Sequence, residues 1–454
     1  MPYISLNPAT NKTLKTYTSW DSYHLAAALE QAYNAQQTWA HTTFAERAES
    51  MNRAAVLLHE RVNEYAGLMA VEMGKPLREG RAEVEKCALA CDYYAVHAEH
   101  FMKTEMVQTD AGKSYVSYYP IGVVLGVMPW NFPFFQVMRF AAPALMAGNA
   151  CALKHASNVP QCALALEELF RDAKFPPQLF SALLIEAADV PEAIASHYIH
   201  AVTLTGSETT GRDVASHAGQ HLKKCVLELG GSDAFIILKD ADLEHAASIA
   251  AKSRFQNCGQ SCIAAKRIIP VAEIADEFLS LFIKKAADLK IGDPLNEATQ
   301  LGPMARLDLR EALHQQVTDS VAQGAQPILG CEPLPGDGAF YPPSILERVT
   351  AKTRAYHEEL FGPVAAVIRA ADEEEAVHIA NDTRFGLGSS IWSHDAERAE
   401  KIAQRIQAGC TFINGMVRSD PRLPFGGTKA SGFGRELSYH GIREFANIKT
   451  VWIR

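Results

Sequence analysis

The stretch AVTLTGSETTG, residues 201–211, carries a clear local signal for the fold. It opens with a largely apolar run of strand length, and Gly206 then marks a turn. Ser207 and the threonines after it are typical of a helix start, where a hydroxyl caps free backbone N–H groups. Gly206 and Gly211 therefore bracket a predicted strand-to-helix turn. Backbone N–H groups at such a turn can also hold a phosphate, although a plain helix cap explains the same residues.

The same alternation of strand and helix continues on both sides of this stretch. A second alternating set begins after residue 262 and ends with GCTFING, residues 409–415. Alternating strands and helices are typical of doubly wound parallel sheets, so we expect an α/β fold. Around the opening stretch, short apolar runs separated by helical patterns occupy residues 123–130, 150–156, 181–185, 225–231 and 234–240.

The flanking segments show other periods. Apolar residues recur every three or four positions before residue 104, which predicts three helices, at residues 24–40, 47–74 and 78–102. The alternating segment SYVSYYPIG, residues 114–122, predicts a strand with one wet face. The final stretch, residues 440–454, ends in alternating residues and predicts a strand at a sheet edge.

Chain length and net charge limit the classes of function that the protein can have. A chain of 454 residues is too long for one simple core and suggests two or three domains. The net charge of −9 leaves no basic surplus for nucleic acid or an anionic membrane, so we expect neither as a partner. The first residues lack the order of a signal peptide, and no apolar run reaches membrane-spanning length. We therefore expect a cytoplasmic protein.

The segment FQNCGQSCIAAK, residues 255–266, contains two of the nine cysteines. An odd number of scattered cysteines argues against a disulfide framework, and the spacing of Cys258 and Cys262 does not suit a structural zinc site, so we expect no metal. Cys262 comes just past a turn. At a helix start, the helix dipole would favour its thiolate. Cys258 is compatible with a small, buried apolar residue.

Two other segments offer chemistry. In MPWNFP, residues 128–133, two prolines restrict the backbone, and the Asn131 amide could stabilise an oxyanion. The alternative is a structural turn with core aromatics. In LELGG, residues 227–231, Glu228 ends an apolar strand, where partial burial would raise its pKa and suit it to act as a general base. The alternative is a helix cap or a structural ion pair. No G-x-G-x-x-G follows a predicted strand, so the usual dinucleotide fingerprint is absent.

Taken together, these segments resemble the NAD(P)-dependent aldehyde dehydrogenase superfamily over nearly the whole chain, and the succinate-semialdehyde dehydrogenases within it most closely. The matching motifs are PWNFP (129–133), Lys154, TGS (205–207) with Gly211, LELGG (227–231), GQSC (259–262), EELFGP (358–363) and PFGGTKASGFGRE (424–436). The resemblance implies two doubly wound α/β domains plus a small β arm for oligomerisation, and a homodimer or homotetramer. It assigns residues 1–104 and 121–229 to the NAD(P)-binding domain, 230–430 to the catalytic domain, and 105–120 and 431–454 to bridging and oligomerisation segments.

The resemblance also implies catalytic roles. Cys262 would attack an aldehyde and form a thiohemiacetal, and Asn131 with the backbone N–H of Cys262 would stabilise its oxyanion. Hydride loss would leave a thioester, and Glu228 would activate the water that hydrolyses it to the acid.

The cofactor implied by the resemblance is NADP or NAD. Trp130 and Ser207 would contact its pyrophosphate, Lys154 the adenosine ribose, and Glu359 and Phe361 the nicotinamide riboside. NAD-preferring members often place a glutamate three residues after the lysine, where this chain has Ser157. A serine does not repel a 2′-phosphate as a carboxylate would, which favours NADP. The cofactor contacts expected from the resemblance are Trp130, Lys154, Ser157, Gly206, Ser207, Gly211, Glu359 and Phe361.

For the substrate, the resemblance points to a carboxylated aldehyde, succinate semialdehyde. Arg139 and Ser419 match two positions that hold its distal carboxylate, whereas a second arginine of the family is replaced by Gln256. One alternative is a broad-specificity aliphatic aldehyde dehydrogenase in which Arg139 is structural. Another is a thiol esterase that uses Cys262, Asn131 and Glu228 without a cofactor, and a third is a non-catalytic scaffold.

Overall fold

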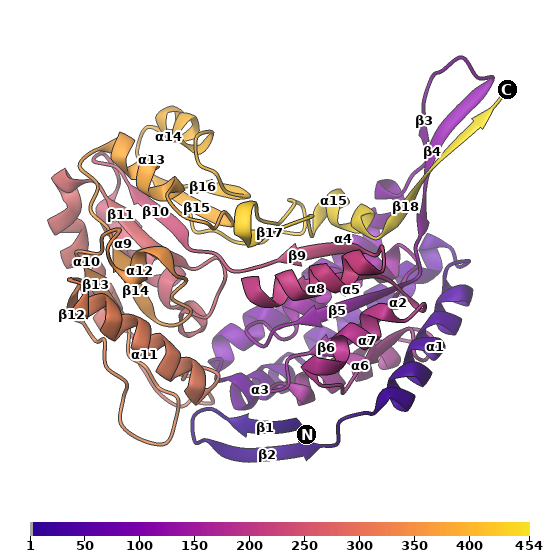
Figure 1. Cartoon of the computed structure of the whole chain (residues 1–454), viewed down its shortest axis with the longest axis horizontal. Coiled ribbons are helices and arrows are strands. Elements are labelled where there is room, and N and C mark those ends of the chain that lie inside the picture. Colours follow the sequence, from indigo (N-terminus) through magenta and orange to yellow (C-terminus); the bar gives the residue numbers. More distant parts are fainter. Residues whose placement is uncertain (1–2) are drawn as a thin grey trace.

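The computed structural model describes residues 3–454. It has two lobes, each built around a sheet, and a thin arm that projects from one of them (Figure 1). Each lobe has its own buried hydrophobic cluster. Both large sheets contain mainly parallel strands flanked by helices, which confirms the predicted α/β fold. Among residues 3–454, no helix combines the length and the apolar character needed to cross a membrane.

The first lobe contains a six-stranded sheet of order β17-β9-β8-β5-β6-β7. Only β17 runs antiparallel to its neighbour. The parallel strands are almost wholly buried because helices cover the sheet, which explains why they are apolar along their length. The strands are β5 (Val123–Met128), β6 (Ala150–His155), β7 (Phe180–Ala182), β8 (Ile199–Thr205), β9 (Lys224–Glu228) and β17 (Gly432–Phe433).

Within residues 3–104, the structure has four helices and not the three predicted. The second predicted helix breaks at Arg61, whose backbone (φ −100°, ψ 15°) leaves the helical region. The helices of this lobe are α1 (Ser22–Trp39), α2 (Phe44–Glu60), α3 (Val62–Met73), α4 (Leu77–Phe101), α5 (Phe135–Met146), α6 (Pro160–Asp172), α7 (Val190–Ala195), α8 (Glu208–Gln220) and the short η1 (Ala187–Asp189).

The second lobe contains a seven-stranded sheet of order β12-β13-β14-β11-β10-β15-β16, in which only β12 is antiparallel. Its strands are β10 (Asp233–Ile237), β11 (Ala265–Pro270), β12 (Gln326–Leu329), β13 (Ser344–Glu347), β14 (Val364–Val367), β15 (Gly388–Trp392) and β16 (Cys410–Ile413). Its helices are α9 (Leu243–Phe255), η2 (Gln256–Gly259), η3 (Ala272–Ile274), α10 (Ala275–Ala287), α11 (Leu307–Ala322), α12 (Arg354–His357), α13 (Glu373–Asn381), α14 (Ala396–Ala403) and η4 (Lys429–Ser431).

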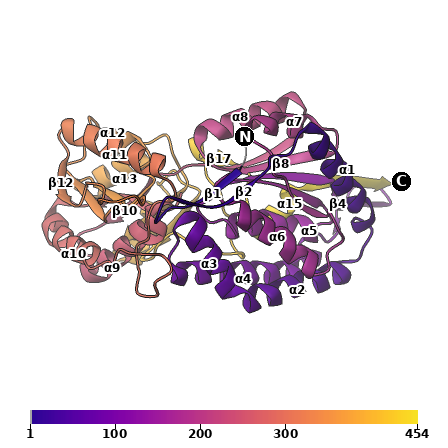
Figure 2. The same ribbon diagram turned by 90° about the horizontal axis from the view of Figure 1, so that it is seen from below.

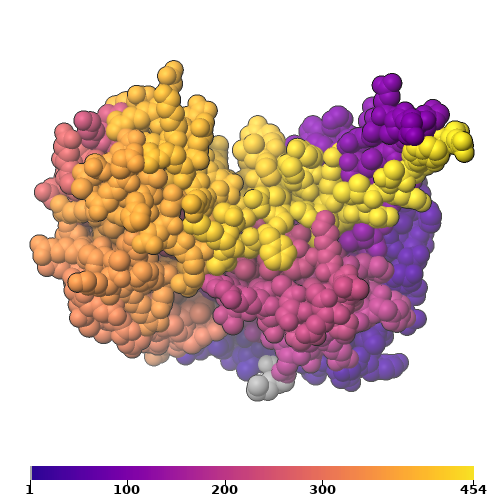
Figure 3. Space-filling view, turned by 45° about the horizontal axis from the view of Figure 1, so that its top comes forward, coloured from indigo at the N-terminus to yellow at the C-terminus, as the bar shows by residue number. Residues whose placement is uncertain are grey.

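The arm is a three-stranded antiparallel sheet in which β18 (Ala446–Ile453) and β3 (Glu105–Met106) flank β4 (Lys113–Pro120). The edge strand predicted at the end of the chain is therefore present. The helix α15 (Ser438–Glu444) leads into it. Figure 3 shows the C-terminal segment, in yellow, running over the surface from the second lobe to this arm.

An N-terminal hairpin of β1 (Tyr3–Asn7) and β2 (Lys12–Tyr17) was not predicted. Two residues of β1 are buried, Tyr3 and Ser5, whereas Ile4 and Leu6 are exposed. Ser5 donates to Glu72 Oε1 at 2.7 Å, so the inward face of this strand is partly polar. The hairpin packs on α3 and α6 of the first lobe (Figure 2), and its turn reaches the second lobe, where the carbonyl of Pro8 accepts from the Ala339 N–H at 2.8 Å.

The predicted division into NAD(P)-binding, catalytic and bridging segments stays a prediction as far as the role of each is concerned. The two large sheets, the arm and the β1–β2 hairpin fall within the corresponding ranges with one difference. The strand β17 lies in the predicted bridging segment but pairs with β9 of the first lobe, where Gly432 faces Glu228.

We expect Gly432→Ala to destabilise the protein. Gly432 has φ +109°, and a Cβ there would overlap the carbonyl oxygen of Leu227. A non-glycine residue in such a conformation costs about 1–3 kcal/mol before the overlap is counted. Thermal midpoints at one scan rate will measure the effect, because large proteins often unfold irreversibly.

The matched control is Gly219→Ala in α8, where a Cβ would meet nothing within 4 Å. It should raise stability by about 0.5–1 kcal/mol, since alanine is the better helix former. Equal midpoints for the two variants would show that the β17 junction does not constrain the fold.

Candidate active site

Cys262 lies in the turn that joins η2 to β11, and its side chain is half-buried. The prediction that it starts a helix is wrong, because α9 and η2 end before it and β11 follows at Ala265. A helix dipole therefore does not activate this thiol. Burial raises the pKa of Cys262 to about 11, while the positive charges of Arg139 and Lys266 act in the opposite direction.

The chain reaches Cys262 through three consecutive residues with left-handed backbone: Asn257 (φ 55°), Cys258 (φ 54°) and Gly259 (φ 68°). Such a run is costly for residues other than glycine and persists only where its surroundings hold it. The Asn257 side chain donates to the carbonyls of Asn131 at 2.7 Å and Gln260 at 3.2 Å. Cys258 itself is buried in the core, and burial raises its pKa, which fits the inert role expected for it.

Asn131 is buried directly against this turn. Its side-chain Nδ2 donates to the Gln260 carbonyl at 3.1 Å, and its backbone carbonyl accepts from Lys75 Nζ at 2.8 Å. Lys75 is paired in turn with Glu83. The side-chain amide is therefore bound to Gln260, which stands two residues before Cys262 in the chain. Its expected role is to stabilise an oxyanion. That role stays a prediction.

Glu228 ends β9 and is buried, with no hydrogen-bond partner for either carboxylate oxygen among the described residues. The helix α8 is capped by Ser207, so Glu228 is not a helix cap. Burial and the neighbouring carboxyl of Glu436 raise the pKa of Glu228, whereas Arg139 and Arg435 oppose the rise. A buried carboxylate that has a raised pKa and no hydrogen-bond partner is suited to accept a proton.

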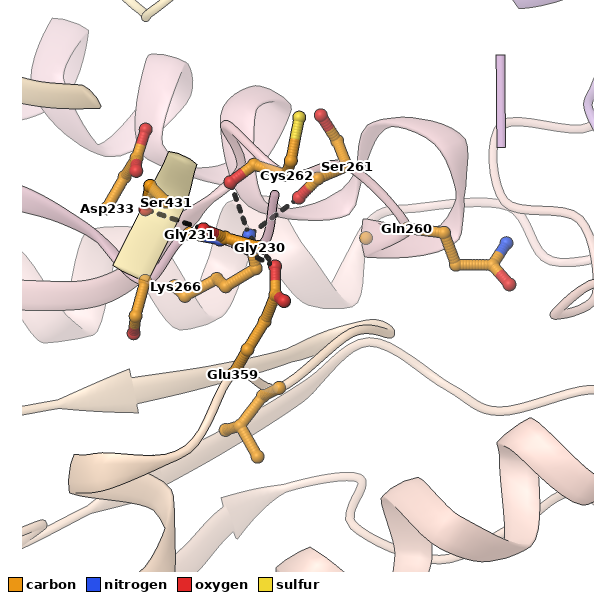
Figure 4. A network of polar contacts seen from close by, with 12 residues as sticks. Gly230, Gly231, Asp233, Gln260, Ser261, Cys262, Lys266, Glu359 and Ser431 are labelled. Carbon is orange, nitrogen blue, oxygen red and sulfur yellow. Dashed lines mark hydrogen bonds and ion pairs between the residues drawn. The ribbon is translucent and has the colours of Figure 1, made fainter. Parts of the chain in front are cut away.

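Lys266 and Glu359 connect the nucleophile turn to the Gly230–Gly231 loop (Figure 4). Lys266 Nζ donates to the carbonyls of Ser261 at 2.6 Å and Cys262 at 2.8 Å, and pairs with Glu359 Oε1 at 3.1 Å. The same oxygen of Glu359 accepts from the Gly231 N–H at 3.2 Å. Figure 4 shows the sulfur of Cys262 pointing away from this network, so the thiol is left free to react.

The residues predicted to contact the pyrophosphate and the nicotinamide riboside are each held by neighbouring side chains or backbone. The rings of Trp130 and Phe361 meet edge to face at 5.8 Å, and both are half-buried. Ser207 caps α8 by accepting from the Thr210 N–H at 3.2 Å, so the first turn of α8 follows Gly206 directly, as predicted. A Cβ on Gly211 would collide with the Leu229 side chain, so glycine lets α8 pack closely there.

Lys154 and Ser157 line a cavity of about 570 Å³ between the lobes, together with Asn158 and Arg306. Burial lowers the pKa of Lys154 to about 8. Both polar atoms of the Asn158 amide are buried and have no partner within residues 3–454. An ammonium, the exposed hydroxyl of Ser157 and an unpartnered amide suit a phosphorylated ribose, so these residues fit the adenosine end of NADP.

A second cavity of about 200 Å³ opens beside Cys262. Gln256 lines it, where the resemblance would have placed an arginine. Both predicted carboxylate-binding residues line it as well, but each has a partner: Arg139 is ion-paired with Glu436, and Ser419 accepts from Lys86 Nζ at 2.6 Å. The predicted substrate role of these two residues is therefore not yet tested.

The family follows from a comparison with family models. Residues 2–451 match the model of the aldehyde dehydrogenase family, which covers nearly the whole chain and includes the buried cysteine turn, Asn131 and Glu228. The chain belongs to the aldehyde dehydrogenase family. The predicted membership is thus confirmed.

Known relatives of this aldehyde dehydrogenase share its full length. A probable NADP⁺ succinate-semialdehyde dehydrogenase from Synechocystis sp. is 49% identical over 453 residues, with all of both chains covered. An NADP⁺ succinate-semialdehyde dehydrogenase from Mycobacterium avium is 48% identical, with 100% of this chain and 97% of the relative covered. The crystal structure of succinic semialdehyde dehydrogenase from Streptococcus pyogenes with NADP⁺ matches with a TM-score of 0.97 at 38% identity over 99% of each chain.

Sequence reasoning missed three charged residues of this aldehyde dehydrogenase site: Lys86, Lys266 and Glu436. Lys86 lies in a helical pattern, Lys266 ends the segment of residues 255–266, and Glu436 ends the PFGGTKASGFGRE motif, but none was given a role. Their contacts in the site depend on tertiary packing, which the local pattern does not reveal. No group of three or more metal-ligating side chains occurs within the part of the chain that the structure describes.

We expect alkylation to distinguish the two cysteines of the nucleophile turn. Iodoacetamide should modify the half-buried Cys262 and spare Cys258, which is 1% exposed. Because the pKa of Cys262 is about 11, its thiolate fraction should still be rising at neutral pH. The labelling rate should increase about tenfold per pH unit across the neutral range. Peptide mapping by mass spectrometry measures it, and a plateau near neutral pH would contradict the raised pKa.

Proposed function

We propose that this aldehyde dehydrogenase oxidises succinate semialdehyde to succinate with NADP⁺. The observation that carries the proposal is the 200 Å³ cavity, which has a thiol at Cys262 and cationic side chains in its wall. A small aldehyde with an anionic far end is complementary to such a cavity. Relatives at 48–49% identity that are named for this substrate and cofactor support the same conclusion.

The first step is attack by the Cys262 thiolate on the aldehyde carbon. Arg139 and Lys266 favour the thiolate, since both positive charges oppose the effect of burial on its pKa. Asn131 Nδ2 and the backbone N–H of Cys262 donate to the oxyanion of the thiohemiacetal. Fixed donors in a buried site stabilise such a charge more than water does, because they need no reorganisation.

The second half of the reaction depends on Glu228. NADP⁺, when bound, supplies the hydride acceptor, and Cys262 then carries a thioester. Glu228 takes a proton from water, and the hydroxide attacks the thioester carbon and releases succinate and the thiol. Its raised pKa makes Glu228 a stronger base once it is ionised, and Arg139 limits the rise.

The residues proposed to hold the cofactor are those predicted from the sequence. Lys154 and Ser157 take the 2′-phosphate end in the 570 Å³ cavity, where Asn158 offers an unpartnered amide. Trp130, Gly206, Ser207 and Gly211 shape the pyrophosphate site, and Glu359 and Phe361 orient the nicotinamide riboside.

A broad-specificity aliphatic aldehyde dehydrogenase is the second candidate. It is favoured by the ion pair of Arg139 with Glu436, which gives Arg139 a structural role. In that case the cavity would not discriminate between charged and neutral aldehydes.

We also propose a cytoplasmic homodimer or homotetramer. The arm supports oligomerisation because it extends from the body and exposes apolar side chains on its edge strand: Ile448 is 61% exposed and Trp452 50% exposed (Figure 1). An exposed, partly apolar edge strand is a ready site for pairing with another chain.

The proposed function predicts a preference that steady-state kinetics can measure. With NADP⁺, kcat/KM should be at least about tenfold higher for succinate semialdehyde than for butanal, since a charge-assisted contact contributes about 1.5–3 kcal/mol. Equal values would leave the broad-specificity enzyme. Cys262→Ala should abolish the dehydrogenase activity, and Cys258→Ala should retain it. If the main activity is instead the hydrolysis of thioesters in the absence of NADP⁺, the protein is a thiol esterase.

Ser157→Glu should convert the cofactor preference. A carboxylate at this exposed position beside Lys154 would repel a 2′-phosphate and could accept from a 2′-hydroxyl. We expect the Kd for NADP⁺ to rise more than tenfold, about 1.4 kcal/mol, while the Kd for NAD⁺ changes little. Fluorescence titration of both cofactors measures it, with Ser157→Gln as the neutral control. An equal loss for both cofactors would place Ser157 outside the phosphate subsite.

A further inference from the structure

Glu79 connects the first lobe to the start of the nucleophile turn. It lies in the first turn of α4, and its Oε2 accepts from the backbone N–H of Asn257 at 2.8 Å. Asn257 is 1% exposed and is the first of the three left-handed residues that lead to Cys262. A buried N–H that loses its acceptor is costly, so this carboxylate helps to hold the left-handed run in place.

The side chain of Asn257 extends this contact to the residues that are expected to react. Its amide donates to the backbone carbonyls of Asn131 at 2.7 Å and Gln260 at 3.2 Å. The side chain of Asn131 binds the same Gln260 carbonyl at 3.1 Å. A shift of the Asn257 backbone would therefore displace both the turn that bears Cys262 and the loop that bears the Asn131 amide. A displacement of about 1 Å in a site can lower a rate about a hundredfold.

A simpler role for Glu79 is to stabilise α4, because an acidic residue in the first turn of a helix interacts favourably with the helix dipole. That role needs no contact with Asn257. Glu79 also lines the 200 Å³ cavity beside Cys262 and a neighbouring hollow of about 800 Å³. A carboxylate in this place is not suited to bind an anionic aldehyde, so its contact with Asn257 is the more informative one.

We propose that Glu79 is a positioning residue for the reaction of Cys262. Its carboxylate binds the Asn257 N–H, and through Asn257 it holds the thiol and the Asn131 amide in the arrangement that attack on an aldehyde needs. The inference rests on the proposed function in taking Cys262 as the nucleophile, and it does not depend on which aldehyde is oxidised.

The ionisation of Glu79 supports the same role. Burial raises the pKa of Glu79 to about 7, and the Asn257 N–H is the strongest influence in the opposite direction. A donor that lowers the pKa of a carboxyl group binds its ionised form more tightly. The contact is therefore strongest above pH 7 and weakens as Glu79 is protonated below it.

Other ionisable groups surround Glu79, both on its own helix and on the elements that face it. They are Lys75, Arg78, Glu83 and Cys258 and, in the walls of the two cavities, Lys86, Arg139, Lys252, Cys262, Lys285, Glu297 and Arg418. Wild type and a Glu79 variant share all of these groups. A ratio of their rates at each pH therefore isolates the ionisation of Glu79.

The test follows single turnovers by the absorbance of NADPH in a stopped-flow instrument, with saturating enzyme in excess over succinate semialdehyde or butanal. At pH 8, Glu79→Ala should lower the rate constant roughly ten- to hundredfold for both aldehydes. Glu79→Gln keeps an acceptor oxygen without the charge. Its rate constant should be about fivefold below wild type at pH 8 and within about twofold at pH 6.

Two controls accompany the test. Glu99→Ala removes an exposed glutamate from the same helix and should leave the rate constant within about twofold of wild type. The Kd for NADP⁺, measured by fluorescence titration, should also stay within about twofold in each Glu79 variant, because Glu79 lies outside the cavity assigned to the cofactor.

The outcomes separate this proposal from the proposed substrate. A wild-type rate constant in Glu79→Ala overturns the positioning role, and a lower Tm beside it leaves Glu79 only a role in the stability of α4. A loss in Glu79→Gln that is the same at pH 6 and pH 8 also overturns the proposal. A wild-type enzyme that oxidises butanal but not succinate semialdehyde removes the proposed substrate, and butanal then decides the role of Glu79. If Glu79→Ala does not fold, the pH dependence of Glu79→Gln decides it.

Discussion

The backbone carbonyl of Asn131 is the point on which the site depends. It accepts from Lys75 at 2.8 Å and from Asn257 at 2.7 Å, so one oxygen ties the PWNFP loop to the left-handed run before Cys262. Glu83 of α4 extends the tie by pairing with Lys75 and accepting the N–H groups of Phe134 and Phe135. The strained backbone is stable only inside this network, since each contact offsets part of its cost. Contacts from the first lobe therefore position Cys262 as much as contacts within the second lobe do.

The charged side chains of the site form small local pairs. Arg139 serves two buried carboxyls, Glu436 and Glu228, and only Glu436 is in contact with it. Glu228 is left without a partner, and its proton affinity is high because burial disfavours the ionised form. On the opposite side, Lys266 pairs with Glu359 while it binds the carbonyl of Cys262. Arg139 thus lowers the pKa of both the thiol and the base, whereas Lys266 acts on the thiol.

The sequence predicts those site residues that stand at the ends of strands. Glu228 and Ser207 follow apolar runs, so their positions could be derived from the alternation of strand and helix, and the motif order supplied Asn131 and Cys262. The helix expected at Cys262 was wrong because the left-handed run of Asn257 to Gly259 ends η2 and leads the chain into β11. Lys86 could not be found, because a lysine in a helical pattern is usually solvated. Only the packing of α4 against α5 brings it to the cavity.

The pairing of β17 with β9 sets an order of assembly. The parallel strands of the first lobe come from residues 123–228, but its sheet gains its last strand from residues 432–433. The strand β4 of the arm likewise gains its long partner from residues 446–453. During synthesis, the N-terminal lobe waits with an open sheet edge beside Glu228 while the second lobe emerges and folds. Such late, long-range strand pairing slows folding and leaves an exposed edge that invites aggregation. The catalytic base is therefore enclosed only after nearly the whole chain has been made, so a truncated product lacks a finished active site.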